Sequence, residues 1–348
     1  MHAKITGIFQ IAAVYVGTVV GAGFATGREI AEFFTQYGLF GLFGIVLAGL
    51  VFVWMGTKIM LIALKIKAAS YQELNRHLFG KRWGILVNGL FFIMLLGVSA
   101  VMLSGAGAVF EEHLHIPKVW GVILTSLLAL LILMQGMKGL IAINIVVVPL
   151  MIFFSFLLLW NGIKQPHFLE DALRMPATGI SWGSTFSPIL YSAFNLALAA
   201  AVLVPTAAEI KDVNVIKGGG IAGGIALTAI LVSGHLALST LPDVLGYSIP
   251  SAELMKQGSS VLYYIFLLVV YGEIFTSLVG NTFGLERQLR TIVKAKSLLI
   301  YVSLLAVAYL IGQFEYGALL SFLYPLFGYV STVFLVLLFR SSQAFEGE

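Results

Sequence analysis

Long apolar stretches separated by short polar loops run through the whole chain. A helix needs about 20 mostly apolar residues to cross a bilayer, and ten apolar stretches approach or exceed this length. The stretches are 5–27, 33–57, 83–110, 119–137, 139–163, 175–208, 218–242, 257–285, 297–314 and 316–339. We therefore predict an all-α polytopic membrane protein with ten transmembrane helices.

Composition strengthens this prediction and excludes several classes of protein. Hydrophobic residues make up 59% of the chain and charged residues 10%, whereas soluble domains carry about 25% charged residues. We expect the excess apolar surface to contact membrane lipid. The net charge of +4 indicates no nucleic-acid partner, because the basic residues lie in short loops between apolar stretches. The absence of cysteine excludes disulfides and thiol catalysis.

The basic residues predict the orientation of the helices. Lys and Arg collect on the cytoplasmic side of membrane proteins. With the N-terminus inside, all but five of the 20 basic residues fall on that side. The five exceptions are Arg28, Lys118, Lys164, Arg174 and Lys256. We expect a multi-pass protein of the bacterial cytoplasmic (inner) membrane with both termini in the cytoplasm.

Two pairs of acidic positions recur at one offset. Glu29 and Glu209 each follow an apolar stretch, and Glu73 and Glu253 each precede one; 209 − 29 and 253 − 73 both give 180. Five helices per unit would place the second copy in the opposite orientation, as in inverted-repeat transporters. The pattern predicts one transmembrane domain built from two repeats, although chance similarity is the alternative. The predicted repeats are 1–165 and 175–341.

The first apolar stretch contains four glycines between Gly17 and Gly27. Glycine weakens a helix by about 1 kcal/mol relative to alanine, so the cluster predicts a discontinuous first helix. Backbone N–H groups of Gly21, Ala22 and Gly23 would start a half-helix running through Phe34 and could bind an anion. Carbonyls from Gly17 to Val20 could bind a cation. The alternative is close helix packing through small residues.

The sixth apolar stretch is the second candidate for a discontinuous helix. Pro188, the mid-span Asn195 and a following tract of small residues predict a weaker break there. Around the two breaks, Phe24, Tyr191 and Phe194 are candidate walls of a substrate pocket. Ordinary core packing is the alternative for these aromatic side chains.

Glu273 is the only carboxylate deep within an apolar stretch. An intramembrane acid is costly and is a functional candidate by default. Glu273, Thr276 and Ser277 share one helix face and offer hard oxygen ligands for Na⁺ or a proton relay. The alternative is one buried hydrogen bond between helices, with the Ser and Thr hydroxyls bonding to the backbone of their own helix. Arg28 and Glu29, at the external end of the first stretch, are candidates for a gating ion pair or for an interfacial anchor.

The run from Gly17 to Glu29, the ten spans and the 180-residue offset resemble the LeuT-type fold of five-plus-five inverted repeats. Within that fold the chain resembles the YkvI-like bacterial membrane proteins, grouped with the amino acid–polyamine–organocation (APC) transporters. The resemblance implies that Gly21 and Gly23 bind an amino-acid carboxylate, and that the sixth-span break binds the amino group.

The same resemblance implies an ion site. Sodium-coupled relatives use first-span carbonyls, here Gly17 and Val20, with adjacent hydroxyls matching Thr276 and Ser277. Glu273 departs from the small residue usual at its position, so Na⁺ and H⁺ both stay open as the coupling ion.

Together these features predict a symporter that moves a small amino acid, or a related zwitterion or amine, by alternating access. We expect no cofactor beyond the coupling ion. A nutrient receptor on the same fold, binding ligand without turnover, is the alternative. A channel is disfavoured because the spans carry few polar residues. An enzyme is disfavoured because no nucleophile–base pair or metal cluster is evident.

Overall fold

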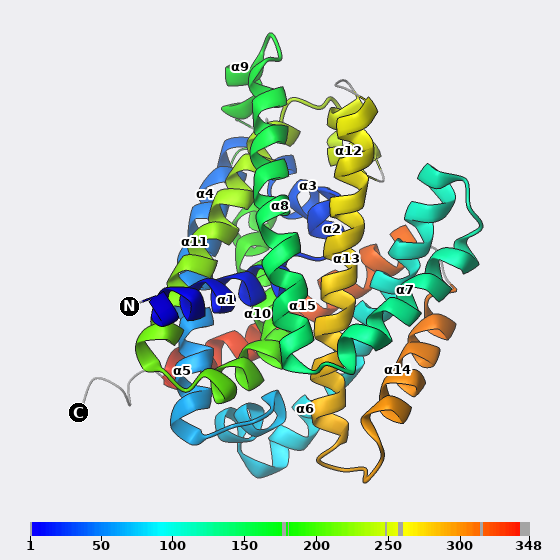
Figure 1. Cartoon of the computed structure of the whole chain (residues 1–348). Helices are drawn as coiled ribbons and strands as arrows, with labels where there is room; N and C mark the ends of the chain where they lie inside the picture. The colour runs from blue at the N-terminus through cyan, green and yellow to red at the C-terminus, as the bar shows by residue number, and fades with distance from the viewer. Residues whose placement is uncertain are drawn as a thin grey trace.

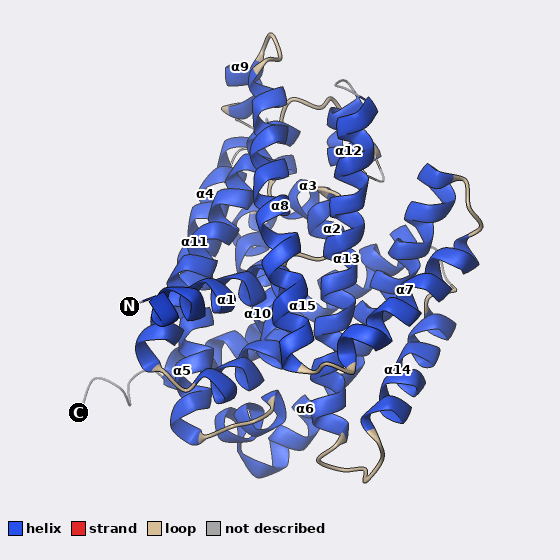
Figure 2. Ribbon diagram, viewed as in Figure 1, coloured by secondary structure: helices blue, strands red, loops and turns tan. Residues whose placement is uncertain are grey.

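The computed structural model describes residues 2–175, 179, 181–247, 249–256, 260–313 and 316–341. Across these residues the regular structure is helical throughout, without strands (Figure 2). The helices up to the middle of the chain are α1 (His2–Val19), α2 (Ala22–Ala25), α3 (Arg28–Phe33), α4 (Gly38–Val51), α5 (Thr57–Ile66), α6 (Tyr71–Ala108), α7 (Lys118–Leu133) and α8 (Met137–Ile163).

The remaining α-helices are α9 (Phe168–Ala172), α10 (Trp182–Ile210), α11 (Val213–Leu238), α12 (Pro250–Lys256), α13 (Ser260–Leu289), α14 (Ser297–Ile311) and α15 (Tyr316–Arg340). Two 3₁₀ turns, η1 (Thr35–Tyr37) and η4 (Val244–Gly246), and two π-helical segments, η2 (Phe52–Gly56) and η3 (Val109–His113), complete the regular structure described.

The helices have the length and composition of a membrane protein. Six stretches are long and apolar enough to cross a bilayer: 28–66, 71–113, 137–163, 182–210, 213–238 and 260–289. Four shorter apolar helices accompany them: 4–19, 118–133, 297–311 and 326–340. The membrane class is confirmed, and the count of ten crossings stays a prediction.

Large apolar side chains cover the outside of the bundle. Phe43 and Leu50 on α4, Val146 and Phe153 on α8, and Leu310 on α14 are all exposed. Water would penalise so much contiguous apolar surface, whereas lipid does not. The interior is packed with buried apolar residues from α1, α6, α8, α10, α11 and α13.

The predicted break in the first helix is present. α1 ends at Val19, and α2 begins at Ala22. α1 packs against α8, α10, α11 and α13, so its broken end lies in the interior of the bundle (Figure 1). Non-helical backbone at such a depth must be buried in protein or line a water-filled cavity, because lipid offers it no hydrogen-bond partner.

The half-helix after the break differs from the prediction. It was expected to run without interruption through Phe34, but α2 contains only Ala22–Ala25 and α3 starts again at Arg28. Gly27 separates them with φ 82°, a conformation that favours glycine. The Thr26 carbonyl at this turn accepts a 3.0 Å hydrogen bond from the Ser251 N–H of α12, which anchors the turn to a distant segment.

The predicted break in the sixth span is wrong at the level of secondary structure. α10 is one helix from Trp182 to Ile210, with Pro188 and Pro205 inside it. The Ser192 hydroxyl donates to the Pro188 carbonyl at 2.7 Å, and the Asn195 amide donates to the Tyr191 carbonyl at 3.0 Å. These polar side chains bond within their own helix, and the alanine-rich tract that follows has high helix propensity.

The order of elements around residues 70–80 has a counterpart 180 residues later. α6 begins at Tyr71 and is kinked at Gly80, which has φ 75° and ψ 174°. α12 begins at Pro250 (250 − 71 = 179), and α13 begins at Ser260 (260 − 80 = 180). The parallel is compatible with duplication, and the division into two repeats stays a prediction.

Loops predicted to share a membrane side lie together. α9, α12 and the α8–α9 connection occupy one end of the molecule, whereas the α5–α6 and α13–α14 connections occupy the other (Figure 1). At the second end, the Thr291 hydroxyl donates to the Gln72 side chain at 2.7 Å, and the Lys58 ammonium donates to the Phe339 carbonyl at 3.1 Å. Which end faces the cytoplasm stays a prediction from the basic residues.

Candidate ion and substrate site

The break in α1 exposes two carbonyl groups to α13. In a continuous helix, the carbonyls of Gly17 and Val20 would accept from N–H groups four residues later. Here the Ser277 hydroxyl donates to the Val20 carbonyl at 2.7 Å, and the Thr276 hydroxyl lies 3.4 Å from the Gly17 carbonyl. The predicted set of Gly17, Val20, Thr276 and Ser277 is therefore assembled in space.

Thr276 makes a local bond as well. Its hydroxyl is 3.0 Å from the Glu273 carbonyl of its own helix, which is the back-bonding expected of many membrane threonines. The Ser277 bond has no such local alternative among the described contacts and crosses directly to α1. Both hydroxyls are buried, so a dehydrated cation is the kind of ligand this cluster of oxygens suits.

Glu273 is completely buried, with 0% of its surface exposed. Neither carboxylate oxygen has a hydrogen-bond partner among the described residues. Glu273 lies one helical turn before Thr276 and Ser277 on the same face of α13. A buried ionised carboxylate without a partner is strongly disfavoured, so this side chain requires a proton or a cation.

Asn144 of α8 is a polar residue at the site that the sequence analysis missed. It is 1% exposed, and its Oδ1 atom has no partner among the described residues. Its Nδ2 atom donates to the Leu140 carbonyl at 2.8 Å. A Cβ at Gly17 would overlap Asn144 Oδ1, so Gly17 allows the amide to approach the α1 backbone. An amide within an otherwise apolar span was the available signal.

The candidate substrate residues in the α1 break and on α2 are enclosed by protein. A Cβ at Gly21 would lie 3.1 Å from Met102 of α6 and 3.5 Å from the Ser277 hydroxyl. A Cβ at Gly23 would overlap a Glu29 carboxylate oxygen, and Phe24 is buried. The Ala22 side chain lies outside the described residues.

The candidate residues on α10 face two aromatic clusters. The Tyr191 ring contacts Phe33, Phe34 and Phe52, with ring centroids 5.0–6.0 Å away. The Phe194 ring stacks on Phe327 of α15 at 6.3 Å. Asn195 is buried and bonds to its own helix. The described contacts therefore place Tyr191 beside α3, and Phe194 beside α15.

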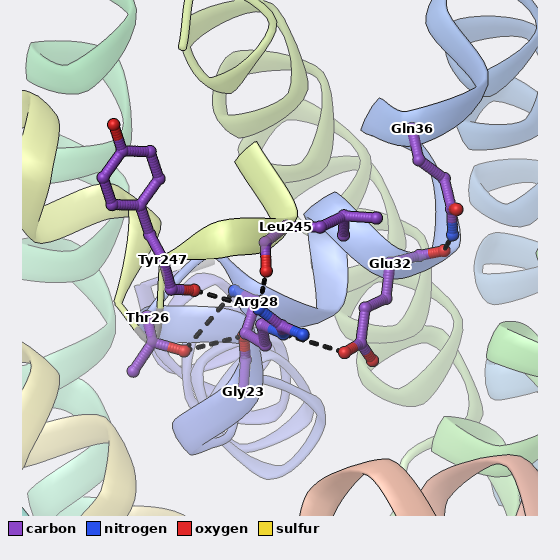
Figure 3. Close-up of polar contacts among 7 residues, drawn as sticks. All are labelled: Gly23, Thr26, Arg28, Glu32, Gln36, Leu245 and Tyr247. Atoms are coloured by element: carbon purple, nitrogen blue, oxygen red, sulfur yellow. Dashed lines mark hydrogen bonds and ion pairs between the residues drawn. The ribbon is translucent and has the colours of Figure 1, made fainter. Parts of the chain in front are cut away.

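Arg28 and Glu29 do not form the gating pair considered above. Arg28 donates from Nε to Glu32 at 2.8 Å and from Nη1 to the carbonyls of Leu245 and Tyr247 at 2.5 and 3.0 Å (Figure 3). The i,i+4 spacing places Glu32 on the same helix face as Arg28, whereas Glu29 turns inward. Glu29 is buried and packs against Gly23.

A cavity of 860 Å³ opens between α3, η1, α10 and α15. Its wall includes Glu32, Phe33, Ser187, Leu190 and Tyr329. Because Phe33 also contacts the Tyr191 ring, the aromatic cluster lies directly behind this wall. Among the described residues, no group of three His, Cys, Asp or Glu side chains could hold a metal ion.

The bundle and the broken first helix define the chain as a membrane protein of the LeuT fold. It superposes on a Na⁺-coupled sialic acid symporter in a substrate-bound outward-open state with a TM-score of 0.68 and 15% identity, covering 97% of this chain and 74% of that one. It superposes on the manganese transporter of Eremococcus coleocola with a TM-score of 0.63 and 14% identity, covering 96% and 76% of the two chains. At such low identity, the likeness shows the fold.

Sequence comparison then identifies the family. The chain is 45% identical over 329 residues to the uncharacterized membrane protein YkvI of Bacillus subtilis (strain 168), covering 94% of this chain and 93% of that protein. The chain belongs to the YkvI family, as the resemblance implied. No protein-family model matches it.

Proposed function

We propose that this chain is a Na⁺-coupled secondary transporter of a small amino acid or a related amine. The observation that supports this proposal is that two adjacent α13 hydroxyls, those of Thr276 and Ser277, contact the two carbonyls that the α1 break frees. Na⁺ would replace these hydrogen bonds and bind the four oxygens directly. The hydroxyl hydrogens rotate freely and would then turn away from the ion.

Such an ion would couple binding to conformation. It would join α1 to α13, two helices whose relative position can change when a LeuT-type bundle alternates its access. A cation that binds one arrangement of the two helices more tightly shifts the population toward that arrangement. Na⁺ bound at the α1 break would thus stabilise one relative position of α1 and α13.

The substrate is proposed to lie along α2, between the α1 break and the aromatic cluster of Tyr191. Gly21 and Gly23 have no side chain that would separate a substrate carboxylate from the backbone N–H groups, as expected from the sequence for an amino-acid site. The Glu29 carboxylate beside Gly23 favours a substrate with an amino group. The 860 Å³ cavity next to the Tyr191 cluster supports an entry path from the α3 end.

Thermal unfolding of the purified full chain in matched Na⁺ and K⁺ tests the ion site. A ligand present at about 100 times its Kd stabilises the folded state by about 2.7 kcal/mol. We expect stabilisation by Na⁺ and not by K⁺, and further stabilisation when the right amino acid or amine is added. Equal stability in both salts at concentrations up to about 0.5 M would contradict the proposal.

Uptake into proteoliposomes tests transport itself. Substrates found by stabilisation are supplied outside with an inward Na⁺ gradient, and empty liposomes serve as the control. Saturable, Na⁺-dependent accumulation is expected. Binding without accumulation would instead establish the alternative, a receptor on a transporter fold.

A further inference from the structure

Gly23, one of the two glycines to which the family resemblance assigns a substrate carboxylate, lies against a carboxylate of the protein itself. A Cβ at Gly23 would lie 2.7 Å from Cγ and 2.9 Å from Cδ of Glu29, and it would overlap one of the Glu29 oxygens. Glu29 is only 3% exposed. A carboxylate brought by the substrate would lie next to this one in a buried site, where two like charges repel each other.

The turn at Gly27 returns α3 toward α2 and brings Glu29 beside Gly23. Backbone and hydroxyl groups hold this turn. The Gly27 N–H donates to the Phe24 carbonyl at 3.0 Å, and the Thr26 hydroxyl donates to the Gly23 carbonyl at 3.1 Å. Because these bonds fix the turn, its backbone does not require an acidic side chain at position 29. An acid inside a membrane bundle is a candidate for ligand binding.

The nearest basic side chain in sequence is directed elsewhere. Arg28 donates to Glu32 and to two carbonyls at η4 (Figure 3). Among the described residues, Lys58 is the only buried Lys or Arg, and its ammonium donates to the Phe339 carbonyl of α15. A substrate carboxylate beside Glu29 would therefore find no fully buried basic partner in the described part of the chain. A substrate cation would find the Glu29 carboxylate.

The Tyr191 hydroxyl is a second feature that indicates a ligand. Tyr191 is 0% exposed, and its hydroxyl has no hydrogen-bond partner among the described residues, although buried polar groups are almost always hydrogen-bonded. Its ring lies 5.3 Å from that of Phe33, between centroids. Phe33 follows Glu29 by one helical turn on the same face of α3. The Tyr191 side chain therefore packs against the face of α3 that carries Glu29.

A carboxylate, a phenol oxygen and aromatic rings together suit an alkylammonium ion. The ammonium group has three N–H donors, and both the Glu29 carboxylate and the Tyr191 oxygen can accept from it. Aromatic faces attract a cation as well, and the rings of Phe33, Phe34 and Tyr191 lie together here. The same rings can pack against the alkyl part of the ligand.

We propose that the transporter selects a primary amine that carries no carboxylate, and that its ammonium group binds between Glu29 and Tyr191. Glu29 supplies the negative charge that an amino acid would bring itself. This selectivity rests on the proposed transport function and narrows its substrate class from amino acids and amines to amines alone.

Matched pairs of ligands test the selectivity on the unmodified full chain. Each pair is an amino acid and the amine that lacks only its carboxylate: alanine and ethylamine, leucine and isoamylamine, phenylalanine and phenethylamine, lysine and cadaverine. Thermal unfolding is followed in Na⁺ at about pH 7, where alkylamines are protonated as the lysine side chain is. We expect at least one amine to stabilise the chain, with a Kd at least about tenfold below that of its amino acid.

Substitutions of Glu29 should change this preference. Glu29→Gln keeps the shape and removes the charge, so the amine Kd should rise at least about tenfold. Glu29→Ala also vacates the space beside Gly23, so the amino acid should then bind more tightly than its amine. Glu286→Gln is the matched control, because Glu286 is a buried carboxylate of α13 that pairs with Arg290 at 3.7 Å. The control should keep the original preference.

Tyr191→Phe separates ligand binding from packing. The variant keeps the ring and loses a buried hydroxyl that has no partner among the described residues. Without ligand it should therefore be at least as stable as the original chain. The amine Kd should nevertheless rise about three- to tenfold, because the ammonium loses one acceptor. An unchanged amine Kd would remove this hydroxyl from the site.

The outcomes separate the two proposals. An amino acid that stabilises the chain at least as well as its amine would overturn the amine selectivity and leave a Na⁺-coupled amino-acid transporter standing. Failure of every amine and every amino acid of the panel to stabilise the chain in Na⁺ would overturn both. An amine preference that persists unchanged in Glu29→Gln would contradict the role of Glu29. The ligand pairs on the unmodified chain decide the selectivity even if the Glu29 variants do not fold.

Discussion

Replacing Ser277 by alanine tests the junction between α1 and α13 at its shortest contact. The hydroxyl lies 2.7 Å from the Val20 carbonyl, and both residues are buried. Removing the donor leaves a buried carbonyl without its partner, which costs about 1–3 kcal/mol of unfolding free energy. In the Na⁺-bound state, the variant loses one oxygen ligand. Taking about 1.5–3 kcal/mol for a contact to a charge, the Na⁺ Kd should rise roughly 10–150-fold.

The assay is Na⁺ titration followed by thermal unfolding, with K⁺ keeping ionic strength constant. Ser155→Ala is the matched control, because Ser155 is also buried in a membrane helix and donates to the Met151 carbonyl at 2.9 Å. The control should lose stability without changing the Na⁺ Kd. An unchanged Na⁺ Kd in Ser277→Ala would refute the assignment of this hydroxyl as an ion ligand.

Three further predictions test other contacts. Gly17→Ala places a Cβ onto the Asn144 amide and should lower the unfolding free energy by about 1–3 kcal/mol. Gly89→Ala is the control, because a Cβ there has no contact within 4 Å, and it should not lower the unfolding free energy. Equal shifts in melting temperature for the two variants would contradict the packing argument. Arg28→Ala removes the bonds to the η4 loop and should speed amide hydrogen exchange there, so unchanged exchange would count against this anchor. Asp212 caps α11, and hydrogen bonds from the backbone N–H groups of Val215 and Asn214 lower its pKa below the ordinary value of an aspartate. Its stabilisation is present above that ordinary pKa and is lost as pH falls through the lowered pKa. The difference in melting temperature between the original chain and Asp212→Ala should therefore become smaller in acid, and a constant difference would contradict this prediction.

The break in α1 and its ion-site neighbours could be predicted because their signals are local. Glycine clustering disfavours a helix whatever surrounds it, and residues 276 and 277 share a helix face by spacing alone. The pairing of those hydroxyls with Gly17 and Val20 came from family resemblance. The contacts that assemble the pair are tertiary and span more than 250 residues in sequence.

The wrong predictions and the omitted residue concern features that depend on tertiary contacts. Pro188 and Asn195 indicated a break, but polar side chains on α10 bond within the helix and leave it continuous. Arg28 has an acidic residue next to it in sequence, yet consecutive residues on a helix point in different directions, and Glu32 is its partner. Asn144 is an amide in an apolar span, but its place at the site depends on the tertiary contact with Gly17.

The contacts of Arg28 with η4 also affect how this part of the protein can change in evolution. The guanidinium binds main-chain oxygens of Leu245 and Tyr247 (Figure 3), and every residue type supplies such an oxygen. Side chains in the loop can therefore be replaced among relatives while the contact persists. Correlated substitutions between Arg28 and the loop should be absent from an alignment of the family, although the two segments are joined in space.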